Sequence, residues 1–114
     1  MSAPNERPWG RYDVLFKSAD VQVKRITVNS GMRFSLQKHL KRSESWVVVS
    51  GEGRATLDDR EIPVARGSVI QVAVGQIHRM HNTGRQPLVF IEVQLGDYLE
   101  EDDIIRLADD FKRT

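Results

Sequence analysis

Short runs of strand-forming residues, each closed by a turn rich in glycine or polar residues, repeat along most of the chain. In the run over 21–28, successive side chains alternate between two faces, so that Lys24 shares a face with Ile26 and Val28. Many short strands separated by such turns are typical of a β-sandwich or a barrel. The sequence predicts strands from residue 14 onward, at 21–28, 32–39, 46–50, 54–57, 61–64, 68–73, 77–82 and 87–95.

The two ends of the chain show different patterns. Residues 1–6 are expected to form a flexible tail. Near the other end, apolar residues recur at the spacing of one helix face, at Ile104, Leu107, Ala108 and Phe111. Asp102 or Asp103 can cap the first turn of such a helix. We therefore expect one domain over 1–114, all-β, with a short α-helix over 102–113 lying across it.

Composition excludes several classes of protein. The net charge is only +1, which argues against a nucleic-acid binder that uses a basic face. The chain has no cysteine, so it can form neither a disulfide framework nor a thiolate zinc site. Its first residues are polar, and no apolar run approaches the length of about 18 residues expected of a membrane helix. We therefore expect neither a signal peptide nor a membrane segment. The expected location of the protein is the cytoplasm.

Four side chains form a possible set of metal ligands. Gln37 and His39 are two residues apart on a predicted strand and therefore point the same way. Glu44 follows five residues after His39 and can return to the same place after a short turn, and His78 is a fourth candidate. Two imidazoles, a carboxylate and an amide oxygen suit Zn²⁺, Mn²⁺, Fe²⁺, Co²⁺ or Ni²⁺. A lone histidine is more often a core or surface residue, and Glu44 alone can be an exposed loop charge.

Two motifs that contain these residues resemble those of the cupin family. The first runs Gly, five residues, His-x-His, three or four residues, Glu, six residues, Gly, and is matched here by Gly31, Gln37, His39, Glu44 and Gly51. The second runs Gly, five residues, Pro-x-Gly, two residues, His, three residues, Asn, and is matched by Gly67, Ala73, Gly75, His78 and Asn82. The chain has glutamine at the first His position and alanine at the Pro position. The resemblance implies a double-stranded β-helix, or jelly-roll barrel, with a metal held by Gln37, His39, Glu44 and His78.

The Gln-x-His form of the first motif resembles the mannose-6-phosphate isomerases. The chain is similar to the isomerase domain at the C-terminus of bifunctional mannose-1-phosphate guanylyltransferase/mannose-6-phosphate isomerase, over the stretches 7–10, 35–39, 42–51 and 91–106. The resemblance implies a metal-dependent interconversion of mannose 6-phosphate and fructose 6-phosphate. The chain departs from that family at Ser45, where histidine is usual, and at 111–113, where a Tyr-Gly-Arg-like triplet is usual. The nucleotidyltransferase part has no counterpart in these 114 residues.

Three more residues are candidates for the catalytic base and for phosphate contacts, namely Lys24, Glu92 and Arg106. Glu92 interrupts an apolar strand, where a carboxylate is costly without a partner, so we expect it to line a cavity. Lys24 is expected to point into the same cavity, and Arg106 to reach its mouth from the terminal helix. The ordinary alternatives are a rim ion pair for Glu92, a snorkelling lysine for Lys24 and a solvated helix arginine for Arg106.

The predicted strand over 32–39 also bears on partners. Phe34 and Leu36 would lie on the face opposite Gln37 and His39, exposed unless a second sheet or another subunit covers them. We therefore expect a homodimer. The expected ligand is a small molecule, a phosphorylated sugar, and we expect neither a nucleic acid nor a membrane as a partner. Two other functions remain open: a non-catalytic small metal-binding cupin that binds a sugar or other small ligand, and another metal-cupin chemistry such as that of an oxygenase.

Overall fold

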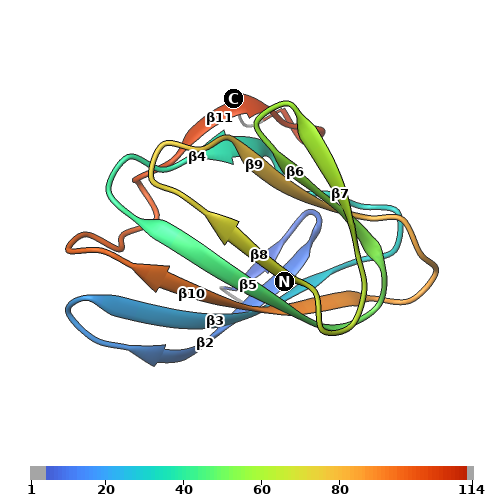
Figure 1. Ribbon diagram of the computed structural model, residues 1–114, viewed down its shortest axis with the longest axis horizontal. Coiled ribbons are helices and arrows are strands. Elements are labelled where there is room, and N and C mark those ends of the chain that lie inside the picture. Colours follow the sequence, from blue (N-terminus) through green and yellow to red (C-terminus); the bar gives the residue numbers. More distant parts are fainter. Residues whose placement is uncertain (1–4, 113–114) are drawn as a thin grey trace.

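Two antiparallel β-sheets form the protein in the computed structural model, which describes residues 5–112 (Figure 1). The larger sheet has the order β1-β2-β3-β10-β5-β8, with β1 (Glu6–Arg7), β2 (Gly10–Lys17), β3 (Val21–Val28), β10 (Leu88–Leu95), β5 (Ser43–Ser50) and β8 (Val69–Val72). The smaller sheet has the order β11-β4-β9-β6-β7, with β11 (Ile105–Ala108), β4 (Leu36–Lys38), β9 (His78–Asn82), β6 (Gly53–Leu57) and β7 (Arg60–Val64). The predicted all-β fold is confirmed.

The inner face of the larger sheet is apolar at one end and polar at the other. On β3, alternate side chains are buried as predicted, including Lys24 and Ile26. The apolar end packs with residues of the smaller sheet into one core, which includes Ile26, Val28, Trp46, Val48, Ala55, Met80, Leu88 and Phe90. The polar end carries the buried side chains Gln22, Lys24, Glu44, Glu92 and Gln94. Because strand register places these polar residues beside one another, one end of the fold holds a buried polar cluster.

Gly51 turns the chain at the end of β5 with a φ of 88°. This left-handed conformation favours glycine. A Cβ atom at this position would also lie 2.6 Å from the carbonyl oxygen of Pro87, which is closer than packed atoms approach. Both constraints explain why glycine closes the first motif.

The helix predicted over 102–113 is wrong for the described residues of that range, none of which is helical. Ile105–Ala108 instead form β11, which pairs antiparallel with β4. Asp103, expected as a helix cap, accepts hydrogen bonds from the backbone N–H groups of Leu40 (2.9 Å) and Lys41 (3.0 Å). A short isolated helix is marginally stable, whereas the open edge of β4 offers backbone partners to this segment.

Two arginines hold the same segment in place. Arg79 is buried and donates hydrogen bonds to the carbonyl oxygens of Phe34 (2.8 Å) and Ala108 (3.2 Å). Arg33 makes a bidentate pair with Asp110, at 2.8 and 2.9 Å. These long-range contacts fix β11 as the edge strand of the smaller sheet.

Phe34, expected to need a second sheet or another subunit to cover it, is buried in the core of the chain itself. Its side chain is 6% exposed, and its ring lies 5.5 Å from that of Trp9 and 6.0 Å from that of Trp46. The regular strand begins only at Leu36, so the two-residue alternation does not extend to Phe34 and Ser35, which are both buried. Phe34 therefore gives no support to a homodimer, which stays a prediction.

Asn5 and Glu6, expected to belong to a flexible tail, take part in the fold. Glu6 pairs with Arg11 in the first β-ladder, and Asn5 donates a 2.7 Å hydrogen bond to Asp13, while residues 1–4 lie outside the described part of the chain. Within the described residues, no helix has the length and apolar character needed to cross a membrane.

Replacing Phe34 by alanine should destabilise the protein strongly, because it removes a ring buried between two tryptophans. We expect Phe34→Ala to lower the free energy of unfolding by about 3 kcal/mol or more, measured by urea denaturation. Phe16→Ala is the matched control, because Phe16 is 56% exposed and should cost about 0.5 kcal/mol or less. Equal losses in the two variants would contradict the burial of Phe34.

Candidate metal centre

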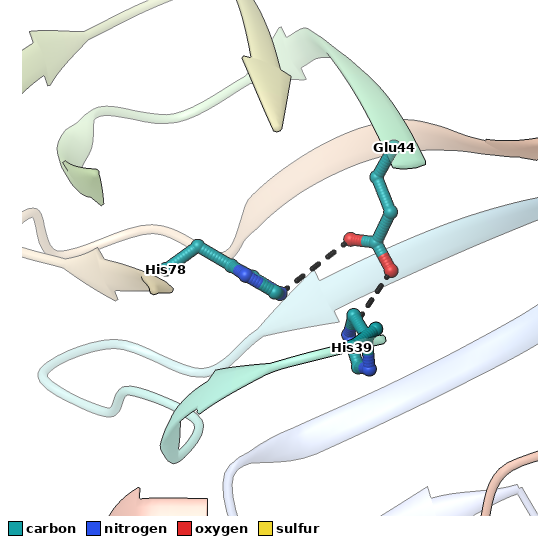
Figure 2. Close-up of side chains that lie close together, drawn as sticks. All are labelled: His39, Glu44 and His78. Atoms are coloured by element: carbon teal, nitrogen blue, oxygen red, sulfur yellow. Dashed lines mark ion pairs between the residues drawn. The ribbon is translucent and has the colours of Figure 1, made fainter. Parts of the chain in front are cut away.

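Three of the four predicted ligands converge at the polar end of the fold. His39 follows β4, Glu44 lies on β5 and His78 begins β9, and their side chains point toward one another (Figure 2). The two carboxylate oxygens of Glu44 face the two rings, at 3.2 Å from His39 Nε2 and 3.7 Å from His78 Nε2. One ligand atom from each residue lies within 4.8 Å of the others, and all three side chains are buried.

Backbone carbonyls set the orientation of both histidine rings. His39 Nδ1 lies 2.6 Å from the carbonyl oxygen of Asp103, and His78 Nδ1 lies 2.9 Å from that of Gln76. A carbonyl oxygen only accepts hydrogen bonds, so each Nδ1 carries a proton, and each Nε2 is the ring nitrogen directed at Glu44. This is the ring orientation that histidine ligands adopt in metal sites.

The charges of the cluster also suit a cation. Burial lowers the pKa of His78, so this ring stays neutral and its Nε2 keeps a free lone pair. Burial by itself disfavours ionised Glu44, but its close contacts with His39 and Glu92 hold the pKa of this carboxyl group well below its ordinary value. His78 Nε2 is buried and has no hydrogen-bond partner. A neutral, unpartnered nitrogen beside a carboxylate fits a divalent metal ion.

Gln37, the fourth predicted ligand, borders the same cluster. Its Nε2 lies 3.5 Å from His39 Nε2, and its Oε1 accepts a 2.7 Å hydrogen bond from the hydroxyl of Ser35. β4 and β9 place Gln37 opposite His78. Rotating the amide by half a turn would direct Oε1 at the cluster, and the Ser35 hydroxyl could then accept a hydrogen bond from the amide nitrogen.

Arg42 is a part of the centre that the sequence prediction missed. This buried arginine donates a 2.9 Å hydrogen bond to Glu44 Oε2, and its Nη2 lies 3.2 Å from His39 Nε2. Its guanidinium therefore contacts two of the atoms that a metal ion would use. The two-residue spacing between Arg42 and Glu44, on one face of a strand, was a signal in the sequence that could have identified it.

A second buried carboxyl group, that of Glu92, lies beside Glu44. Trp46 Nε1 donates to one oxygen of each carboxyl group at 3.1 Å, and Gln94 Nε2 donates to the other oxygen of Glu92 at 2.9 Å. Burial first, and the neighbouring Glu44 second, raise the pKa of Glu92 well above its ordinary value. The surroundings thus favour the ionised form of Glu44 and the protonated form of Glu92, and carboxyl groups whose pKa values are pushed apart in this way are typical of acid–base pairs.

A pocket opens beside the candidate metal centre, and all three predicted catalytic residues line it. Lys24, Glu92 and Arg106 meet there with Gln37 and His39. Arg106 reaches it from strand β11, not from a helix, and its Nε is buried without a partner. Lys24 is buried as expected, but the sequence prediction missed three more residues that line the pocket around it, Arg7, Tyr12 and Glu101. Their positions depend on contacts between distant segments, for which the sequence held no local pattern.

The sequence of the chain is similar to that of a protein family and of several bacterial proteins. Residues 2–109 match the family described as Mannose-6-phosphate isomerase C-terminal. The alginate biosynthesis protein AlgA of Pseudomonas aeruginosa is 46% identical over 108 residues, which are 95% of this chain and 22% of that protein. The mannose-1-phosphate guanylyltransferase of Escherichia coli (strain K12) is 44% identical, over 95% of this chain and 23% of that protein. The chain therefore spans less than a quarter of the length of these relatives.

Solved structures with lower sequence identity to the chain share its fold. A Klebsiella pneumoniae protein with a double-stranded β-helix domain matches with a TM-score of 0.75 and 19% identity, covering 96% of this chain and 90% of that one. The oxalate decarboxylase of Bacillus subtilis, a protein with Mn(II) centres, matches with a TM-score of 0.79 and 26% identity, covering 93% of this chain and 30% of that one. The fold is thus the cupin double-stranded β-helix, and the chain belongs to the Mannose-6-phosphate isomerase C-terminal family.

Proposed function

We propose that the chain is a metal-dependent sugar-phosphate isomerase that interconverts mannose 6-phosphate and fructose 6-phosphate. One observation carries the proposal: a buried cluster of two histidines and a glutamate with a lowered pKa adjoins a pocket lined by cations and by a carboxyl group with a raised pKa. Membership of the isomerase family supports it.

Gln37, His39, Glu44 and His78 would hold the metal ion. Its identity among Zn²⁺, Mn²⁺, Fe²⁺, Co²⁺ and Ni²⁺ does not follow from this ligand set. A bound divalent cation supplies positive charge to the sugar oxygens on which negative charge develops during isomerisation.

The pocket residues perform the other parts of the reaction. Aldose–ketose isomerisation moves a proton between C1 and C2 of the sugar, and a positioned base must accept that proton and return it. Glu92 suits this role, because its raised pKa brings its protonated and ionised forms closer in free energy near neutral pH. Lys24 and Arg106 supply positive charge for the phosphate group.

A binding protein for a sugar or another small ligand is the second candidate. Arg42 favours it, because this guanidinium already contacts His39 Nε2 and Glu44 Oε2 and so neutralises the cluster without a metal. Bound sugar phosphate without turnover would support this function. Oxygen consumption would instead indicate a metal oxygenase.

Removing one ligand should abolish metal binding. We expect the purified protein to carry one divalent ion per chain by elemental analysis, and His78→Ala to lose it, because the buried Nε2 has no replacement. His81→Ala is the matched control, since His81 is only half-buried and lies outside the cluster. Equal metal content in His78→Ala and the unaltered protein would contradict this site.

Replacing the carboxyl group of Glu92 by an amide, which cannot exchange a proton, should slow the chemical step. In a coupled assay with fructose 6-phosphate, we expect Glu92→Gln to lower kcat by about 100-fold or more with a smaller change in KM, since proton transfer loses its base. Glu61→Gln is the control, because Glu61 is exposed on the smaller sheet. Undiminished turnover in Glu92→Gln would exclude Glu92 as the base, and the absence of turnover in the metal-loaded protein would exclude the isomerase.

A further inference from the structure

Lys24 is a buried cation whose charge is balanced by one carboxylate. Its side chain is 4% exposed, and its ammonium lies 4.3 Å from the centre of the Tyr12 ring and forms an ion pair with Glu101. Glu92 lies opposite Lys24 in the strand register, but its two oxygens accept hydrogen bonds from Trp46 and Gln94. A buried ammonium is stable only with a partner, and Glu101 fills that role.

Glu101 reaches Lys24 from the solvent side. It lies in the connection between β10 and β11, and its side chain is 55% exposed. The connection is anchored on both sides of it, by the buried side chain of Leu99 and by Asp103, whose carboxylate binds the backbone amides of Leu40 and Lys41. The Glu101 carboxylate can therefore leave Lys24 while the rest of the connection stays in place.

The pocket that Glu101 enters is rich in cations. Four of its lining residues are basic: Arg7, Lys24, Arg42 and Arg106. Arg106 also keeps a buried Nε donor without a partner. An anion in this pocket would gain both charge and hydrogen bonds, but it would have to take the position next to Lys24 that the Glu101 carboxylate occupies.

We propose that Glu101 is an internal competitor for the anionic group of the ligand, and that Lys24 exchanges the Glu101 carboxylate for that group when the ligand binds. The identity of the anion as a sugar phosphate rests on the proposed function. A neutral sugar has no group that can replace the carboxylate, so the exchange makes the pocket select phosphorylated over neutral ligands.

Removing the charge of Glu101 should strengthen the binding of anions. We expect Glu101→Gln to bind fructose 6-phosphate and inorganic phosphate at least about fivefold more tightly than the unaltered protein, with little change for fructose. Isothermal titration calorimetry on metal-depleted protein measures this without a contribution from metal–phosphate bonds. Because this test needs no turnover, a failure of the isomerase proposal is seen in the coupled assay, independently of it.

Two further variants make the test specific. Glu100→Gln is the matched control, because its exposed side chain forms only a 3.7 Å pair with Lys17, and it should leave the phosphate Kd unchanged. In a Lys24→Met background, Glu101→Gln should give no gain, since the exchange partner is gone. Unchanged or weaker phosphate binding in Glu101→Gln, or an equal gain in Glu100→Gln or in the Lys24→Met background, would overturn the proposal.

Glu101→Asp tests the same exchange with a more conservative change. If Glu101→Gln does not fold, Glu101→Asp keeps the charge but shortens its reach to Lys24, and should bind phosphate more tightly than the unaltered protein. A folded Glu101→Asp variant with unchanged or weaker phosphate affinity would also overturn the exchange.

Discussion

The carboxylate of Glu44 lies in the protein interior, 2% exposed, and is held there in its ionised form. Burying a charge is costly unless it is paired and hydrogen-bonded, and Arg42 and the indole of Trp46 meet that requirement. Burial raises the pKa of Glu92, and the same carboxylate raises it further and faces the Nε2 atoms of both histidines. Burial and this one buried charge therefore act together on the pKa values of the centre.

The centre is possible because the inner face of the larger sheet changes character along its strands. β3, β5 and β10 each contribute apolar side chains to the core at one end and polar side chains at the other. The rigid apolar part holds the strands in register, and the register brings Lys24, Glu92 and Glu44 together. The last segment of the chain completes the arrangement, since Asp103 orients the ring of His39 and Arg106 closes one side of the pocket.

Most of the fold and of the candidate centre could be predicted from local sequence patterns and from the spacing of the two motifs. Alternation along β3 and β10 identified Lys24 and Glu92 as inward-facing, and motif spacing brought His78 to His39 and Glu44. The errors occurred where partners far away in the sequence decide the structure. Residues around Ile105 have helical spacing but pair with β4, because Asp103 binds the backbone near Leu40, more than 60 residues away. Arg42 was overlooked although it stands two residues from Glu44, whereas the role of Glu101 depends on Lys24, which only the fold brings within reach.

The position of the two tryptophans has a practical consequence. Trp9 lines the pocket, and the indole N–H of Trp46 is shared between the carboxyl groups of Glu44 and Glu92. Since the chain contains two tryptophans in all, its tryptophan fluorescence arises from these indoles, one beside the candidate centre and one in the pocket wall. Indole emission responds to nearby charge and to solvent, so the protein carries an unlabelled optical reporter, in which one fluorophore senses the buried carboxyl pair and the other senses the pocket wall.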